Sequence, residues 1–185
     1  MLPAALLVLA SSAAHAGPTG EPSAALRSRM ATALQAPDGF VDHYDAEVWL
    51  VDMSGRLKRF MPDAAARISF LRMLHEEATR AKLSPELVLA VIQIESRFDR
   101  FAISRSGAEG YMQIMPFWIE EIGGKGDNLF HTRTNLRMGC NILRYYLDKT
   151  HDDWVKALAR YNGSSGRADY PYKVLRALNG RWSPG

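Results

Sequence analysis

The sequence SPELVLAVIQIESRF, residues 84–98, decides the fold class that we expect for this chain. It opens with a serine hydroxyl that can cap a helix, a proline at the first helical position and an acidic residue in the first turn. Apolar residues follow at helical spacing, without the alternation that is typical of a half-buried strand. We therefore expect a helix over residues 84–98, most of it apolar.

Glu95 does not fit the apolar character of this helix. In a helix its side chain shares a face with Val88 and Ile92, so the carboxylate continues an apolar stripe. Withdrawal from water and the negative end of the helix dipole both disfavour the charged carboxylate. Together they raise the pKa of a glutamate from about 4.3 towards about 6. An acid that stays protonated near neutral pH can act as a general acid in glycosidic cleavage.

A salt bridge is the alternative interpretation of Glu95. Arg97, Arg100 and Arg105 follow closely in the sequence, and any of them could neutralise a carboxylate at the end of a helix. In that case the pKa of Glu95 would be lowered and the residue would have no catalytic significance. Residues 84–98 alone leave both interpretations open.

Helical spacing of apolar residues continues along most of the chain. Residues 41–61 are ambiguous because Ser54 and Gly55 could turn a hairpin, but we favour a helix there. Residues 99–111 are rich in glycine, serine and charge, which predicts a loop. No alternating pattern competes after residue 62, so the expected fold class is all-α. The segments predicted to be helical are 24–36, 41–61, 63–82, 84–98, 112–121, 135–149, 152–161 and 171–179.

The first 16 residues have the layout of a secretory signal. An apolar run over residues 2–10 precedes small residues that end in Ala14-His15-Ala16, a plausible cleavage site. The run is shorter than the roughly 20 residues that span a bilayer. The alternative is a buried N-terminal helix. The signal interpretation predicts export to the periplasm or another extracytoplasmic space, with no membrane-spanning segment after cleavage.

The composition limits the classes of function. With 185 residues the chain is expected to form about one domain. The net charge is only +3 and the sequence contains no run of basic residues, so we expect no nucleic-acid partner. The single cysteine, Cys140, excludes a disulfide framework and a thiolate-rich zinc site, and the five histidines are scattered. We expect no metal and no cofactor, and we interpret Cys140 as a small buried hydrophobe.

Two further segments could supply a binding site. In SRSGAEGYMQIMPFW, residues 104–118, Gly107 and Gly110 permit positive φ or a close approach of the backbone, and the amide of Gln113 can bind a sugar. In ALARYNGSSG, residues 157–166, a Tyr-Asn-Gly sequence ends a predicted helix, where it could simply be a cap. Each feature on its own is explained as well by packing as by ligand binding.

The order and spacing of three motifs resemble the family 1 lytic transglycosylases. The motifs are IESRFD at 94–99, GAEGYMQIMP at 107–116 and ARYNGS at 159–164. The resemblance extends over roughly residues 70–180 and implies a lysozyme-like helical catalytic domain similar to goose-type lysozyme. We therefore expect a signal peptide over 1–16, an N-terminal helical extension over 17–62 and the catalytic domain over 63–185.

The resemblance also implies the residues of a site. It places the catalytic acid on Glu95 and the hydroxyl that holds this acid, or the substrate's N-acetyl group, on Tyr161. A tyrosine stands at position 111 where the family usually has leucine, and Arg160 replaces the first residue of the third motif, so substrate preference is open. The residues implied in substrate binding are Ser96, Gly110, Tyr111, Met112, Gln113, Tyr161 and Asn162.

The implied reaction needs one carboxylate and consumes no water. Glu95 protonates the bond between N-acetylmuramic acid and N-acetylglucosamine in a peptidoglycan glycan strand, and the N-acetyl group stabilises the developing cation. Glu95 then accepts the proton of the muramyl 6-hydroxyl, and a 1,6-anhydro ring closes. A hydrolytic muramidase is one alternative, which would need a second carboxylate such as Glu109 or Asp127. A catalytically silent wall-binding module is another.

Overall fold

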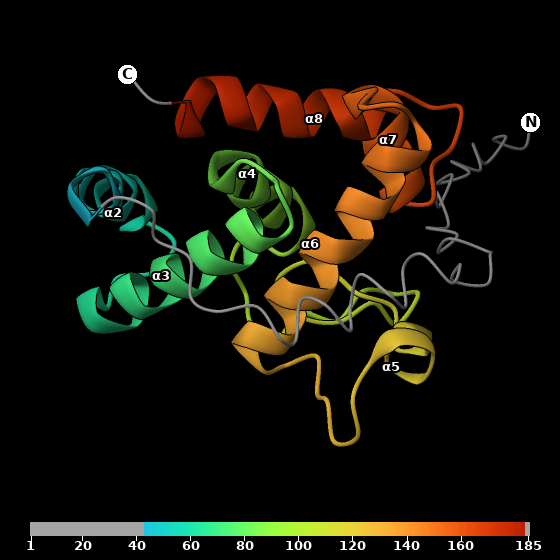
Figure 1. The fold of residues 1–185 in the computed structure, drawn as a ribbon, viewed down its shortest axis with the longest axis horizontal. Coiled ribbons are helices and arrows are strands. Elements are labelled where there is room, and N and C mark those ends of the chain that lie inside the picture. Colours follow the sequence, from blue (N-terminus) through green and yellow to red (C-terminus); the bar gives the residue numbers. More distant parts are fainter. Residues whose placement is uncertain (1–42, 184–185) are drawn as a thin grey trace, which may run out of the picture.

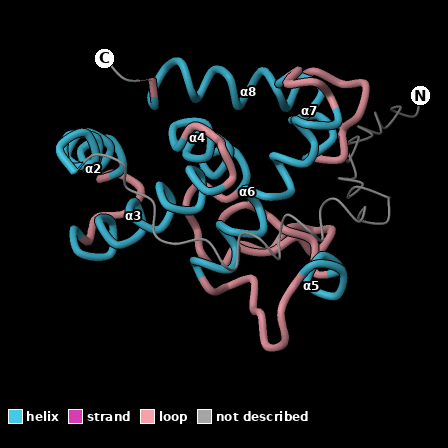
Figure 2. Tube along the Cα trace, viewed as in Figure 1, coloured by secondary structure: helices cyan, strands magenta, loops and turns pink. Residues whose placement is uncertain are grey.

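The computed structural model describes residues 43–183, and within this range the chain is helical with only isolated β-bridges (Figures 1 and 2). The predicted all-α class is confirmed for this range, whereas the expected signal at 1–16 and helix at 24–36 lie outside the described residues. The elements are α2 His43–Leu57, α3 Ala64–Arg80, α4 Pro85–Glu95, α5 Phe117–Ile122, α6 Thr132–Lys149, α7 Trp154–Tyr161, α8 Asp169–Ala177 and a π-helical turn η1 Leu178–Trp182.

Helix α4 lies in the middle of the fold. Its residues from Leu87 to Ile92 are all buried, and α3, α8 and η1 pack around it (Figure 1). Burying a leucine, valine or isoleucine side chain contributes about 1.5–3 kcal/mol, so this helix supplies a large part of the core energy. Position 95, at the end of such a helix, is therefore fixed by the packing of the whole domain.

The start of α4 agrees with the sequence, but its end does not. The hydroxyl of Ser84 accepts the Leu87 N–H at 3.3 Å, and a proline occupies the first turn as predicted. The helix ends at Glu95 rather than at Phe98, because the backbone turns left-handed at Arg97 (φ 54°) and Phe98 (φ 66°). Glu95 is consequently the last helical residue.

The helix predicted over 112–121 is wrong in its first half. Residues 110–113 form a turn instead, and α5 begins at Phe117. Pro116 explains the difference, because a proline lacks an N–H and pushes the preceding residue out of the helical region. The apolar residues between 111 and 115 have helical spacing, but they do not form a helix. Several of them are buried individually at the turn.

Helix α2 settles the ambiguity over residues 41–61. Gly55 lies inside the helix, so the hairpin alternative is wrong. Arg56 donates to the carbonyl oxygens of Arg181 and Ser183 at 2.7 and 2.6 Å, and the buried Arg67 of α3 donates to the Ser54 hydroxyl at 2.9 Å. Helix α2 is thus tied to α3 and to the C-terminal turn, and its buried residues belong to the common core.

Aspartate side chains cap the starts of α3 and α7, whereas α5, α6 and α8 begin without a side-chain cap. Asp63 accepts the Ala66 N–H at 2.6 Å at the start of α3, and Asp153 accepts the Lys156 N–H at 3.0 Å at the start of α7. Helix α8 starts at Asp169, two residues before the prediction, and continues into the unpredicted π-helical turn. Within the described range, no helix is both long and apolar enough to cross a membrane.

Two helical glycines give opposite stability predictions. Gly55 has no atom within 4 Å of an added Cβ, so Gly55→Ala should raise the free energy of unfolding by about 0.5–1 kcal/mol. At Gly139 an added Cβ would lie 2.8 Å from Met112 Cβ, so Gly139→Ala should lower it by about 1–3 kcal/mol. Urea unfolding of both variants measures the difference. Equal effects would contradict the described packing of α6.

Candidate active site

The carboxylate of Glu95 lies where α4, α7 and α8 meet. The buried Tyr170, in the first turn of α8, donates its hydroxyl proton to Glu95 Oε1 at 2.6 Å. The side chain of Asn162, at the end of α7, also donates a hydrogen bond to this carboxylate. Glu95 itself is partly buried and keeps some contact with solvent. One face of the acid is thus held by the protein, and the rest remains within reach of a ligand.

The pKa of Glu95 is raised to about 7. Burial is the largest cause, and the hydrogen bonds from Tyr170 and Asn162 limit the rise. The direction that the sequence predicts for this pKa is therefore confirmed. Among the residues with described side chains, no lysine or arginine forms an ion pair with Glu95. The salt-bridge interpretation is wrong, and Arg100 instead donates to the Phe130 carbonyl oxygen at 2.7 Å.

The partner expected for Glu95 is also corrected. The hydroxyl of Tyr161 donates to the Met112 carbonyl oxygen at 2.8 Å, not to the acid. Glu95 nevertheless lies near enough that its charge contributes to the raised pKa of Tyr161. Tyr170 therefore donates to the acid where Tyr161 was expected to, and the helix predicted at 171–179 began too late to include it.

The turn at residues 110–113 depends on a glycine. Gly110 has φ of 75°, and a Cβ on it would lie 2.6 Å from the Leu129 carbonyl oxygen and would also collide with the Asn135 amide. Only glycine adopts this backbone at no steric cost. The predicted positive φ at Gly110 is confirmed, as it is at Gly107 (φ 86°).

Three side chains hold the backbone of this turn. The hydroxyl of Ser96 donates to the Tyr111 carbonyl oxygen at 2.8 Å, and Tyr161 donates to that of Met112. The Met112 N–H donates to Asn135 Oδ1 at 2.8 Å. Each anchor comes from a different helix end or helix, so the turn is fixed by the tertiary structure.

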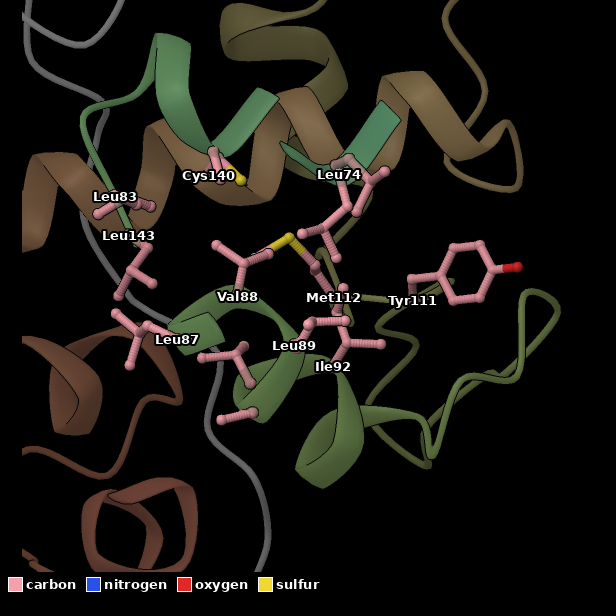
Figure 3. Packing of buried hydrophobic residues seen from close by; sticks show 14 of the residues in the cluster. Leu74, Leu83, Leu87, Val88, Leu89, Ile92, Tyr111, Met112, Cys140 and Leu143 are labelled. Carbon is pink, nitrogen blue, oxygen red and sulfur yellow. The ribbon is translucent and has the colours of Figure 1, made fainter. Parts of the chain in front are cut away.

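Several residues implied in substrate binding lie beneath the turn rather than on its surface. Met112 is fully buried, and Figure 3 shows its side chain among Leu74, Val88 and Ile92. The ring of Tyr111 packs at 4.8 Å from that of Phe70. Neither side chain offers a free surface to a ligand.

Gln113 keeps a partly exposed side chain beside these buried residues. Its Nε2 donates to the carbonyl oxygens of Ala102 and Gly110, at 3.1 and 3.0 Å, and its backbone has a left-handed φ of 51°. The amide nitrogen therefore has two partners within the protein. Asn162 and Tyr161 lie near Glu95, and Tyr161 also binds the backbone of Met112, the residue before Gln113.

Other charged groups have structural partners. Asp127 accepts Arg137 Nη2 at 3.2 Å and the Gly124 N–H at 2.8 Å, which neutralises one candidate for a second carboxylate. Cys140 is buried, and burial raises the pKa of its thiol, as expected of a buried hydrophobe. In the part of the chain that is described, no group of three or more His, Cys, Asp or Glu could hold a metal ion.

Sequence comparisons relate the chain to one family of proteins. The family model described as the transglycosylase SLT domain matches residues 72–174. A membrane-bound lytic murein transglycosylase F of Desulfosudis oleivorans is 27% identical over 76% of the chain, and a membrane-bound lytic murein transglycosylase C of Photorhabdus laumondii is 27% identical over 52%. The aligned regions cover 30% and 32% of these relatives, so the chain matches about a third of their length.

Two solved structures resemble the chain more loosely. One is an inactive mutant of the lytic transglycosylase Slt from Pseudomonas aeruginosa, which is 25% identical in sequence and has a TM-score of 0.49. The match covers 66% of this chain and 22% of that one. The other is the 70 kDa soluble lytic transglycosylase of Escherichia coli, which is 20% identical in sequence and has a TM-score of 0.42. The match covers 89% of this chain and 32% of that one.

The raised pKa of Glu95 predicts a pH-dependent stability. Its folded value of about 7 exceeds the ordinary 4.5, so the unfolded chain loses this proton first as the pH rises. The contribution of Glu95 to stability should fall between about pH 4.5 and about pH 7 and then level off. Each pKa unit corresponds to about 1.4 kcal/mol, so Glu95→Gln should gain on the order of 2–3 kcal/mol relative to wild type across this window.

Urea unfolding of both proteins at about pH 4.5 and about pH 8 measures this change. The comparison between the two pH values removes any constant effect of the substitution on packing. A difference in unfolding free energy that is the same at both pH values would contradict the raised pKa.

Proposed function

Because the chain belongs to the transglycosylase SLT domain family, whose model matches residues 72–174, we propose that it is a peptidoglycan lytic transglycosylase. It cleaves the β-1,4 bond between N-acetylmuramic acid and N-acetylglucosamine and leaves a 1,6-anhydromuramyl end. The observation that carries this proposal is the partly buried carboxyl of Glu95, with a pKa raised to about 7 and a hydrogen bond from Tyr170.

The first step of the proposed reaction is protonation of the glycosidic oxygen. Tyr170 donates to Oε1 of Glu95, so the proton of the neutral acid resides on Oε2. A carboxyl with a pKa near neutrality keeps this proton while substrate binds and can still release it in the transition state. The tyrosine therefore orients the acid without taking its proton.

The second step uses the same residue as a base. After protonation of the leaving group, the N-acetyl group of the substrate stabilises the positive charge at the anomeric carbon. The hydrogen bonds from Tyr170 and Asn162 then stabilise the Glu95 carboxylate. Glu95 next accepts the proton of the muramyl 6-hydroxyl, whose oxygen bonds to the anomeric carbon. Both proton transfers need one residue only, so no second carboxylate is required.

The turn at 110–113 is proposed to bind the glycan strand next to Glu95. The partly exposed Gln113 offers its amide to the sugar, and Gly110 lets the turn pack closely against Leu129 and Asn135. Ser96 and Tyr161 keep the turn in place through its carbonyl oxygens, with Tyr111 and Met112 as its buried support. Asn162 completes the site through its bond to the acid.

The two alternatives are less well supported by these observations. Hydrolysis needs a carboxylate that activates water, and Asp127 is bound by an arginine, which leaves Glu109 as the candidate. A silent wall-binding module gives no reason to keep an acid with a raised pKa. The relatives are named membrane-bound lytic murein transglycosylases, which supports action on peptidoglycan outside the cytoplasm. We propose that the chain is exported by the signal at residues 1–16.

Substitution of the two carboxylates separates the alternatives. On purified sacculi, Glu95→Gln should lower the rate of fragment release by about 10²–10⁴-fold, because the general acid is lost. Glu109→Gln should act at close to the wild-type rate. Mass spectrometry should find fragments without an added water, whereas fragments that have gained a water would establish hydrolysis. Release by Glu95→Gln at the wild-type rate would refute the assignment of the acid.

The pH profile tests the role of Tyr170. Since Glu95 must be protonated, kcat/KM should fall as the pH rises through about 7. Tyr170→Phe removes a hydrogen bond that favours the charged form, so this falling limb should move to higher pH. Tyr172→Phe, an exposed tyrosine on the same helix, is the matched control and should leave the limb in place. A limb that is unmoved by Tyr170→Phe would contradict the proposed hydrogen bond.

A further inference from the structure

We propose that Asn135 is a positioning residue that fixes the turn at 110–113 and so sets the affinity for the glycan strand. The inference rests on the proposed function, because it concerns binding at the same site. Asn135 lies near the start of α6, and its side chain is fully buried. It belongs to none of the three motifs at 94–99, 107–116 and 159–164.

Both ends of the Asn135 amide bind segments other than its own helix. Oδ1 accepts the Met112 N–H at 2.8 Å. Nδ2 donates to the carbonyl oxygens of Glu109 and Leu129, at 3.0 and 2.9 Å. A buried amide needs such partners, and these three bonds join α6 to both flanks of Gly110 and to the segment before the helix. The amide therefore specifies the path of the backbone at this point.

Asn141 shows that burial on α6 does not by itself require this arrangement. It is the same residue type on the same helix and is also buried, yet its Nδ2 donates to the carbonyl oxygen of Arg137, one turn earlier in that helix. Asn141 thus satisfies its amide locally, whereas Asn135 satisfies its amide across the fold. The two residues have the same side chain, but Asn135 binds the backbone of other segments and Asn141 binds the backbone of its own helix.

The turn needs a fixed support because its backbone is unusual. Gln113 has a left-handed φ of 51°, which residues with a side chain adopt rarely. Ser96 and Tyr161 hold the carbonyl oxygens of the turn, and Asn135 holds a backbone N–H and packs where any Cβ at Gly110 would lie. Loss of the Asn135 donors would release the chain at Glu109 and shift the Gln113 amide.

Asn135 has no described contact with Glu95, so its effect should appear in substrate affinity and not in the ionisation of the acid. The substitution Asn135→Asp keeps the size and the Oδ1 acceptor but places an oxygen against the carbonyl oxygens of Glu109 and Leu129. Misplacement of a binding group by about 1 Å can cost up to about 10²-fold. We expect KM to rise about tenfold or more in Asn135→Asp, and the falling pH limb near 7 to be unchanged in Gly110→Ala, which displaces the same amide without adding an ionisable group.

The experiment compares Asn135→Asp with Asn141→Asp. KM and kcat on soluble glycan strands, the pH profile of kcat/KM and urea unfolding are measured for both variants. Asn141→Asp should keep the wild-type KM even where its stability falls, which separates positioning from general destabilisation. Gly110→Ala, which forces a Cβ into the Asn135 amide, is the second variant and should also raise KM.

Each outcome bears on the inference. A wild-type KM in Asn135→Asp, an equal rise of KM in Asn141→Asp, or a shifted pH limb in Gly110→Ala would overturn it while leaving the proposed function intact. A wild-type protein that releases no fragments from sacculi would overturn the proposed function and this inference together.

Discussion

The withdrawal of the Glu95 carboxylate from water at the end of α4 is the constraint on which the site depends. The apolar residues of α4 must be buried to form the core, and that burial carries the terminal glutamate out of bulk solvent. Desolvation raises its pKa to about 7, and hydrogen bonds from Tyr170 and Asn162 limit the rise. The same packing that stabilises the domain thus keeps a large fraction of this acid protonated near neutral pH.

The second feature of the site is a turn that three distant parts of the chain hold in place. Ser96 follows the acid directly, Asn135 lies on α6 and Tyr161 ends α7, and all three bind the backbone of residues 111–112. The motifs around residues 95, 110 and 161 are therefore parts of one hydrogen-bonded unit. Ser96 and Tyr161 hold the backbone of this turn, and Gln113 is its partly exposed residue.

Local chemistry explains what the sequence predicts well. A serine before a proline begins α4, and single aspartates begin α3 and α7, because each caps a helix with its own side chain. The direction of the Glu95 pKa is also visible, since an apolar stripe predicts desolvation. Non-local contacts explain the errors. The left-handed backbone at Arg97 and Phe98 ends α4 early, and the apolar Met112 and Ile114 are buried individually at a turn and not along a helix. The roles of Tyr170 and Asn135 depend on partners 75 and 23 residues away, for which a single sequence has no local signal.

The central claim is that the fold withdraws the Glu95 carboxyl from water far enough to raise its pKa to about 7, so that about half of it is still protonated at that pH. The most direct measurement is an NMR titration of the side-chain carboxyl carbon in protein labelled with 13C-glutamate, with the Glu95 signal assigned by its loss in Glu95→Gln. The account predicts a midpoint near 7 for this signal. A midpoint near the ordinary 4.5 would contradict it, because an acid ionised at neutral pH could not protonate the glycosidic oxygen.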